Sequence, residues 1–388
     1  MSNTPKLRFP EFSGEWEEKT FGDILSLNMV PVPKPDTEYE RLGIFCHNKG
    51  TFHEHITDPS YIALDTLYKV HKNNFIVNIT FAWEHAIAIT TQNDEDALVT
   101  FRFLMFSFNK GYYHQFFKYA FSKEKFRYDL NVASPGGAGR NRVLNQKQLN
   151  NINLIVPSIS EQEKIADFLS NVDSIITAET KILNALQKKK KALMQKLFSR
   201  QLRFKSDDGT DFLEWEEKKL GECVEILDSR RKPIESKERA NRKGEYPYYG
   251  ASGIIDYIDD YLFEGESILL GEDEANIINR NSRLAFIATG KYWVNNHAHI
   301  MKANTDNLNY FICEYLESLD YSKICAGSAQ PKLTQDVIRN LTIKAPCKAE
   351  QQKIADCLSS MDSLIQNQQK VVTTWQQRKK ALLQQMFI

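Results

Sequence analysis

The sequence predicts an α+β fold in which two globular domains are separated by two long antiparallel helices, a coiled-coil-like rod, with the halves forming a pseudo-two-fold internal repeat. The first reason is a repeated helix start. The segment EQEKIADFLSNVDSII, beginning at Glu161, matches EQQKIADCLSSMDSLI, beginning at Glu350, at eleven of sixteen positions and an offset of 189 residues. The second reason is a repeated lead-in, because LRF and EWEEK at residues 7–9 and 15–19 recur at 202–204 and 214–218.

Both helix segments carry an apolar seam whose residues recur in steps of three and four, the heptad spacing of a coiled coil. Because each helix leads out of its own domain, the two seams can cover each other only if the helices pair antiparallel. By the same logic, the lead-in of the first half should lie where the second helix ends. We assign the seam to six residues of each helix: Ile165, Leu169, Val172, Ile176, Leu183 and Leu186, and Ile354, Leu358, Met361, Ile365, Val372 and Trp375.

The helix starts also set the predicted domain limits. Pro157 and Pro346 end the segments that precede the helices, and Ser158 with Glu161 has the spacing of a capping box. Short strand-like runs mixed with short helices favour compact α+β domains. The alternative is a repeat protein whose adjacent modules contact each other. The predicted parts are a first domain at 1–157, a first helix at 158–200, a second domain at 201–346 and a second helix at 347–388.

Composition excludes several classes of protein. No apolar run is long enough to span a bilayer, and the six cysteines include no C-x-x-C pair, which favours free thiols in a reducing cytoplasm. The net charge of zero argues against a uniformly basic DNA-coating protein. We find no P-loop, dinucleotide fingerprint or amino-methylation motif, and His297 and His299 lack a third metal ligand, so we predict no catalytic or metal site. The acidic block at 256–274 is interpreted as a solvated face.

Polar loops before each helix unit are the candidate binding segments. Arginine can contact guanine and glutamine can contact adenine, while lysine and serine suit phosphates. Composition alone favours ordinary solvated loops here, and the basic stretch at 228–244 is equally typical of a hydrated loop or a phosphate anchor. The candidate residues are Gly136, Gly137, Arg140 and Arg142 in the first loop, Gly327, Ser328, Gln330 and Lys332 in the second loop, and Arg230, Arg231 and Lys232 in the basic stretch.

These motifs together resemble a known family. The two EQ-x-KIAD-x-LS-x-x-DS helix starts, the lysine-rich helix ends and the loop before each helix resemble the specificity subunit of type I restriction–modification systems. The stretches YPYYGASGIIDYI at 246–258 and YWVNNHAHI at 292–300 resemble parts of that family's target-recognition domains. The resemblance implies a non-catalytic subunit in which each domain reads one half of a split DNA site. Because the two globular segments differ in sequence, we expect an asymmetric bipartite target.

The resemblance also implies roles for individual residues. The loop residues named above become base or phosphate contacts, and Asn296 and His297 join them. Two departures from the family pattern are Cys347, which stands at the cap position of the second helix, and the zero net charge. The helix sides become contacts for partner subunits, and their candidate residues are Lys190, Lys191, Lys379 and Lys380.

The implied partners are double-stranded DNA, two methyltransferase subunits and motor–nuclease subunits, with no membrane and a cytoplasmic location. No cofactor is expected on this chain, because S-adenosylmethionine, ATP and magnesium would be bound by the partner subunits. Two alternatives remain: a stand-alone two-domain DNA-binding regulator that needs no enzyme, and a coiled-coil scaffold that binds no nucleic acid. The regulator should bind DNA tightly as an isolated chain, whereas the scaffold should be insensitive to changes in the loops.

Overall fold

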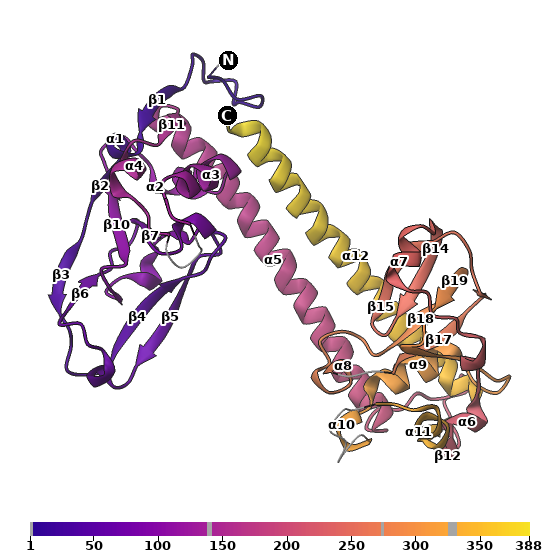
Figure 1. The fold of residues 1–388 in the computed structure, drawn as a ribbon. Helices are drawn as coiled ribbons and strands as arrows, with labels where there is room; N and C mark the ends of the chain where they lie inside the picture. Colours follow the sequence, from indigo (N-terminus) through magenta and orange to yellow (C-terminus); the bar gives the residue numbers. More distant parts are fainter. Residues whose placement is uncertain (1–2, 138–141, 273–274, 325–331) are drawn as a thin grey trace. The chain divides into compact units, whose positions relative to one another are not determined.

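The computed structural model describes residues 3–137, 142–272, 275–324 and 332–388. The chain divides into two compact units: unit 1 comprises Met1–Glu179 with Val371–Ile388, and unit 2 comprises Thr180–Lys370. Helix α5 (Ile159–Phe198) leads from unit 1 into unit 2, and helix α12 (Lys348–Met386) returns to unit 1 (Figure 1). Each unit therefore contains one globular domain and part of each long helix. Among the described residues, no helix is both long and apolar enough to cross a membrane.

The two long helices pair antiparallel within each unit. In unit 1, Lys379 Nζ of α12 lies 2.5 Å from Asp173 Oδ1 of α5. In unit 2, Lys190 Nζ of α5 lies 2.6 Å from Asp362 Oδ1 of α12. The lysines are 379 − 190 = 189 positions apart and the aspartates are 362 − 173 = 189 positions apart, which is the offset of the sequence repeat. One ion pair is thus formed twice, with the roles of the two helices exchanged.

None of the twelve residues of the predicted seam is exposed. Ile165 and Leu169 join the hydrophobic core of unit 1, and Ile354 and Leu358 join that of unit 2. The residues at the ends of the helices are therefore buried by both the partner helix and the globular domain. The partly buried seam residues are Ile176, Leu186, Ile365 and Trp375.

The repeated Glu-Gln pair anchors the lead-in and the start of each helix. Glu161 receives hydrogen bonds from Arg8 Nε at 2.8 Å, Arg8 Nη2 at 2.7 Å and Trp16 Nε1 at 3.3 Å. Glu350 is bound in the same way by Arg203 at 2.9 Å and Trp215 at 3.2 Å. The predicted capping box with Ser158 is wrong, because the Glu161 carboxylate binds the lead-in instead.

The neighbouring glutamines make a second repeated contact. Gln162 accepts the Tyr113 N–H at 2.9 Å and donates to the Pro157 carbonyl at 2.9 Å. Gln351 accepts the Leu308 N–H at 3.1 Å and also donates to the carbonyl of the proline that precedes its helix. Each glutamine therefore connects its helix start to the domain that precedes it.

The lead-in of unit 1 lies at the end of the second helix, as the repeat predicts. The Leu7 N–H donates to the Gln385 carbonyl at 2.9 Å, and the Leu202 N–H donates to the Lys196 carbonyl at 3.0 Å. The two acceptors are 385 − 196 = 189 positions apart. In both units the lead-in therefore lies against the last turns of a long helix. In unit 2 the lead-in follows that helix directly in the chain, whereas in unit 1 the helix is the distant C-terminal one.

The two globular domains share a common frame despite their different sequences. A two-stranded sheet lies at the base of each domain, and a four-stranded antiparallel sheet follows it in the order β2-β10-β7-β8 or β13-β20-β17-β18. The unit 1 strands are β1 (Glu17–Thr20), β11 (Asn153–Val156), β2 (Leu25–Leu27), β10 (Phe103–Phe108), β7 (Phe75–Asn78) and β8 (Ile87–Ile89). The unit 2 strands are β12 (Glu216–Lys219), β21 (Thr342–Ala345), β13 (Val224–Ile226), β20 (Ala298–Ala303), β17 (Ser267–Gly271) and β18 (Ala285–Ala288).

A further sheet differs between the units in strand number and order. Unit 1 has β3 (Val30–Pro33), β6 (Thr66–Lys69), β9 (Leu98–Val99), β4 (Tyr39–Ile44) and β5 (Thr51–Ile56), in the order β3-β6-β9-β4-β5. Unit 2 has β15 (Gly253–Ile258), β14 (Lys243–Gly250), β19 (Lys291–Val294) and β16 (Phe263–Glu264), in the order β15-β14-β19-β16. The two domains therefore combine one repeated frame with two different sheets.

Short helices complete both domains (Figure 1). The predicted α+β class is confirmed by this mixture of helices and strands. In unit 1 they are α1 (Phe21–Ile24), α2 (His114–Ala120), α3 (Glu124–Val132) and α4 (Gln146–Asn150). In unit 2 they are α6 (Leu220–Cys223), α7 (Ser236–Ala240), α8 (Ala275–Asn279), α9 (Asn309–Ser318), α10 (Tyr321–Ile324) and α11 (Gln335–Asn340).

Candidate nucleic-acid interface

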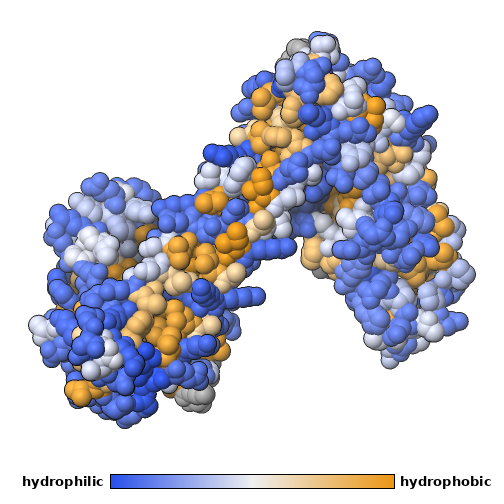
Figure 2. All heavy atoms as spheres, turned by 180° about the vertical axis from the view of Figure 1, so that it is seen from behind, coloured by the Kyte–Doolittle hydropathy of each residue, from blue (hydrophilic) through white to orange (hydrophobic). Residues whose placement is uncertain are grey.

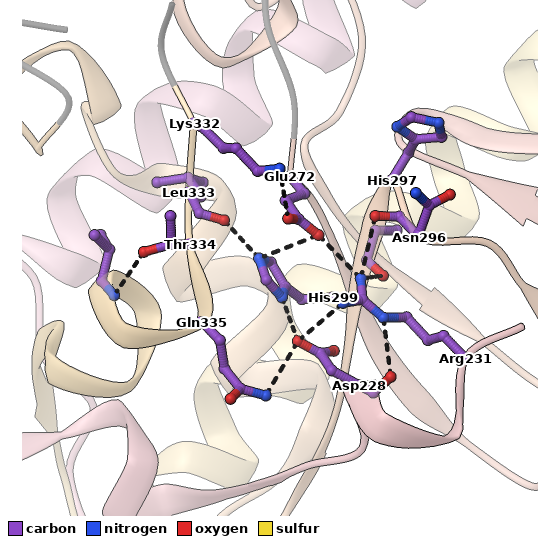
Figure 3. Close-up of polar contacts among 12 residues, drawn as sticks. Asp228, Arg231, Glu272, Asn296, His297, His299, Lys332, Leu333, Thr334 and Gln335 are labelled. Carbon is purple, nitrogen blue, oxygen red and sulfur yellow. Dashed lines mark hydrogen bonds and ion pairs between the residues drawn. The ribbon is translucent and has the colours of Figure 1, made fainter. Parts of the chain in front are cut away.

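In unit 2, three separate segments meet at one corner of the four-stranded sheet, where β17 ends and β20 begins. The Leu333 N–H donates to the Glu272 carbonyl at 3.1 Å, and the Glu272 N–H donates to the His297 carbonyl at 2.9 Å. Lys332 and Asn296 are sequence neighbours of these residues, and Figure 3 shows them at the same place. We call these five residues the unit 2 corner. Three predicted contacts, Asn296, His297 and Lys332, are thus brought together, and all three are exposed.

Ion pairs between charged side chains connect the segments of the unit 2 corner. Arg231 Nη1 lies 3.0 Å from Glu272 Oε2, and Arg231 Nη2 lies 3.4 Å from Asp228 Oδ2. Lys332 Nζ lies 3.2 Å from Glu272 Oε1. Glu272 therefore links the segment before α11 to the basic stretch that follows β13. The interpretation of residues 256–274 as a solvated face is wrong at Glu272, which is only 9% exposed.

His299 is the buried centre of this network. Its Nδ1 lies 2.5 Å from Asp228 Oδ2, and its Nε2 lies 2.6 Å from the Leu333 carbonyl oxygen (Figure 3). Both neighbours are hydrogen-bond acceptors, so both contacts are made only when both ring nitrogens carry a proton. The ring is 1% exposed, and this fits the sequence-based interpretation of a core histidine. His299 therefore ties β20 to the segment before α11.

The environment of Asp228 favours its charged form. Burial opposes ionisation, but hydrogen bonds from His299 and from the Ile300 N–H, with the positive charge of Arg231, hold the pKa of Asp228 below its usual value. A carboxylate that accepts several hydrogen bonds is stabilised as the anion. The ionised Asp228 thus keeps His299 and Arg231 in place.

Arg231 is contradicted as a DNA contact. Its guanidinium is bound to Asp228, Glu272 and the Ala298 carbonyl, and its side chain is only 14% exposed. The neighbouring Arg230 and Lys232 are exposed. The Arg230 guanidinium lies 5.1 Å from the centroid of the Phe263 ring, so it is oriented by stacking while remaining at the surface. These two residues remain predicted contacts.

The equivalent loop of unit 1 is held by Arg142. Its Nε donates to the Ser134 carbonyl at 3.0 Å and its Nη2 donates to the Asn131 carbonyl at 2.8 Å. The guanidinium also lies 5.2 Å from the centroid of the Trp83 ring. This arginine therefore shapes the loop, and its predicted base contact has to share the guanidinium with the protein. Gly136 and Gly137 are exposed, and Gly136 has a φ of +147° that suits glycine.

Four predicted contacts lie outside the described residues: Arg140, Gly327, Ser328 and Gln330. The sequence analysis did not identify Asp228 and Glu272 as part of the polar network at the unit 2 corner, and it assigned no role to His299. These residues come from segments about 30 to 70 positions apart, so no local spacing connects them.

The predicted docking lysines differ in exposure. Lys190 is only 6% exposed and is bound to Glu314 at 2.8 Å and Asp362 at 2.6 Å, so its assignment to an exposed docking surface is wrong. Lys379 is partly buried by its ion pair with Asp173. Lys191 and Lys380 are exposed and remain candidates.

An apolar groove of about 430 Å³ runs between the two long helices in unit 1. Phe168, on its edge, is 37% exposed, and Trp375 is partly buried. Figure 2 shows apolar residues at the surface along the long helices on one face. The groove is lined by Phe168, Asn171, Val172, Ile175, Trp375, Arg378, Ala381, Leu382 and Gln385.

Comparison with known proteins places this architecture in a family. The family model described as type I restriction modification DNA specificity domain matches residues 13–188 and again residues 213–374. The two matches cover most of the chain, which therefore belongs to this family and carries its domain twice. The resemblance found in the repeated helix starts is confirmed. Among the described residues, no cluster of side chains is suited to hold a metal ion.

Individual relatives agree with this assignment. The chain is 34% identical over 153 residues to a Haemophilus influenzae protein described as type I restriction enzyme specificity subunit S.HindORF215P, covering 39% of this chain and 38% of that protein. It is 26% identical over 268 residues to the type I restriction enzyme MjaVIII specificity subunit of Methanocaldococcus jannaschii, covering 62% of each. These alignments span less than two thirds of either relative.

A solved structure shows the same fold over nearly the whole chain. The type I restriction–modification system S subunit from M. genitalium superposes with a TM-score of 0.62 at 16% identity, covering 99% of both chains. The fold with two domains and two long helices, which the sequence predicted, is thus shared with this solved structure.

Proposed function

We propose that this chain is the DNA-specificity subunit of a type I restriction–modification enzyme, in which each unit reads one half of a bipartite target in double-stranded DNA. The observation that carries the proposal is one repeated frame bearing two different sheets. A repeated frame offers two equivalent attachments to the helices, whereas different sheets offer two different reading surfaces. The target is therefore asymmetric.

The unit 2 corner supplies suitable DNA-binding chemistry. Asn296 and His297 present an amide and an imidazole that can donate to or accept from base edges, and Lys332 presents an ammonium that suits a phosphate. The buried ions beneath these residues fix the backbone, so little side-chain and loop entropy has to be lost when DNA binds. Arg230 and Lys232 extend the cationic surface beside the corner.

The chain itself carries no catalytic role in this proposal. Methyltransferase subunits bind the helices and use S-adenosylmethionine to methylate adenine, and motor–nuclease subunits that use ATP and magnesium join the assembly in the cytoplasm. The unit 1 groove supports docking on the helices, because an exposed aromatic and aliphatic surface flanked by polar residues suits a partner helix. The exposed Lys191 of unit 2 and Lys380 of unit 1 supply charged contacts on the long helices.

Genome-wide mapping of adenine methylation tests the proposal. The chain is expressed with its candidate methyltransferase in a host that lacks other adenine methylation, and the methyltransferase alone is the control. We expect a split, asymmetric motif only when both proteins are present. A folded complex that produces no new methylation would contradict the proposal.

Purification and DNA-binding measurements distinguish the alternatives. A stand-alone regulator would bind a specific DNA site as an isolated chain and would copurify with no methyltransferase. A scaffold would leave DNA binding unchanged when Lys332→Ala is introduced into the assembled complex. Family membership favours the specificity subunit over both, because the matched domain is repeated over nearly the entire length of each half.

A further inference from the structure

The common frame makes it possible to compare the two corners residue by residue. The last strand pair at the corner is Asn78 opposite Phe103 in unit 1 and Gly271 opposite Ala298 in unit 2. One position farther out, the Ile79 N–H donates to the Arg102 carbonyl at 2.9 Å. This bond corresponds to that between Glu272 and His297. In register, therefore, Arg102 is the counterpart of His297, and Phe101 is the counterpart of Asn296.

The loop before the small helix confirms this alignment. In unit 1 the Leu144 N–H donates to the Ile79 carbonyl at 2.8 Å, as Leu333 does to Glu272 at 3.1 Å. Each leucine is followed by a residue that caps the next short helix, Asn145 for α4 and Thr334 for α11. The two corners are therefore built in the same way.

Arg102 is exposed, and within the described part of the chain its side chain makes no hydrogen bond or ion pair. Four arginines in the globular part of unit 1 are held by carboxylates or by backbone carbonyls: Arg8, Arg41, Arg127 and Arg142. Arg102 thus differs from these four in having its guanidinium donors available to a ligand.

Exposed apolar side chains lie on the segments that meet at Arg102. Phe101 is 51% exposed, Val143 is 47% exposed and Phe81 is 40% exposed. Backbone hydrogen bonds join the three segments that carry them, because Ile79 binds both Arg102 and Leu144. Single exposed apolar residues are common, but three of them on segments joined to that of Arg102 offer apolar surface from which a ligand can displace water.

We propose that Phe101 and Arg102 are the specificity-determining residues of unit 1, with Arg102 contacting a guanine in the major groove and Phe101 packing against a neighbouring base. This inference rests on the proposed function. Two donors of one guanidinium match the O6 and N7 acceptors of guanine, which is the most frequent specific contact to DNA. Apolar contacts around it recognise a thymine methyl group and exclude water from the hydrogen bonds.

The inference also explains how one frame reads two different half-sites. The unit 2 corner presents an amide and an imidazole above a buried ion network, whereas the unit 1 corner presents an aromatic ring and a guanidinium. Lys332 of unit 2 is matched by Val143 in unit 1, since 332 − 143 = 189. The same backbone positions therefore offer different chemistry to DNA.

The test compares Arg102→Ala and Arg102→Lys in the complete complex with the methyltransferase. Arg127→Ala is the control, because Arg127 is a partly exposed arginine of unit 1 that is already paired with Glu124. Methylation motifs and relative affinities for single-base variants of the target are measured. We expect both Arg102 variants to relax one G·C position of one half-site by roughly 5- to 150-fold, since lysine cannot replace the bidentate contact.

Each outcome separates this inference from the proposed function. If the wild-type complex produces a split motif and both Arg102 variants keep the same motif, the inference is wrong and the function stands. If Arg102→Ala weakens binding equally for all sequences and Arg102→Lys restores it, the residue contacts phosphate and the inference is also wrong. If the wild-type complex produces no split motif, the proposed function itself fails.

Discussion

Lys190 provides a quantitative test of how the helices are held together. Its substitution by methionine keeps most of the apolar stem but removes the charge that faces Glu314 and Asp362. The Glu314 side chain is 2% exposed, so its carboxylate would lose one of two cations in a buried site. Arg283 remains paired with Glu314, and Tyr310 remains hydrogen-bonded to Asp362, so the loss is partial.

We expect Lys190→Met to lower the free energy of unfolding of unit 2 by about 3 kcal/mol, the lower end of the cost of breaking a buried ion pair. The pseudo-equivalent Lys379→Met is the matched control. Its side chain is 28% exposed and faces Asp173, which keeps contacts with Lys118 and Tyr119. A partly exposed pair of this kind contributes about 1 kcal/mol or less.

Urea unfolding followed by intrinsic fluorescence and by helical circular dichroism measures both effects. The two units are expected to unfold in separate steps, so each transition is fitted on its own. Equal losses for Lys190→Met and Lys379→Met would refute the reasoning from burial.

Three further predictions concern the core of the site, a helix start and the docking groove. The lowered pKa of Asp228 means that its carboxylate stabilises the fold at neutral pH and that this contribution is lost as pH falls through the lowered pKa. The Asp228→Asn variant should therefore be less stable than the wild-type chain at neutral pH and should lose less stability on acidification below about pH 4. An equal difference in unfolding free energy between variant and wild type at all pH values, measured by urea titration, would contradict this. Glu161→Ala should lower the free energy of unfolding of unit 1 by about 3 kcal/mol, because Arg8 loses its buried partner, and Glu161→Gln should lower it less. Equal losses for the two variants in denaturant titration would contradict this prediction. Trp375→Ala should weaken methyltransferase binding by about tenfold or more, and unchanged affinity of the folded variant in a calorimetric titration would remove the groove as a docking site.

The long helices could be predicted from sequence because their residues repeat at a constant offset, and the lead-ins because LRF and EWEEK recur before the second domain. Glu161 and Glu350 are parts of nearly identical segments, and the arginines and tryptophans that bind them recur as LRF and EWEEK. The antiparallel pairing followed from the direction in which each helix leaves its domain. These features depend on local sequence and connectivity, which a single chain displays directly.

The common frame of the domains could not be seen in the sequence. The offset between equivalent strands is 216 − 17 = 199 at β1 and β12, 298 − 103 = 195 at β10 and β20, and 342 − 153 = 189 at β11 and β21. Insertions of different length thus shift the alignment while side chains diverge. Arg102 and His297 share a backbone position and no sequence pattern, so only the hydrogen-bond register relates them.

Charged residues were the least predictable part of the site. Arg231 and Lys190 lie in basic stretches that are typical of exposed surfaces, yet both are bound to carboxylates distant in sequence. A run of charged residues in the sequence does not reveal which of them form ion pairs, because the partner of each charge is set by the tertiary structure. The exposed residues of the unit 2 corner were predicted from a polar loop in the case of Lys332 and from the family resemblance in the case of Asn296 and His297.

The central claim is that each globular segment reads one half-site on a shared frame. The direct test is a chain in which residues 202–346 are replaced by a copy of residues 7–157, since Leu7 and Leu202 make the same backbone contact with a helix end. With the methyltransferase, this chain should methylate a split motif that contains the unit 1 half-site twice and lacks the unit 2 half-site. A motif that keeps the original second half-site would contradict the account.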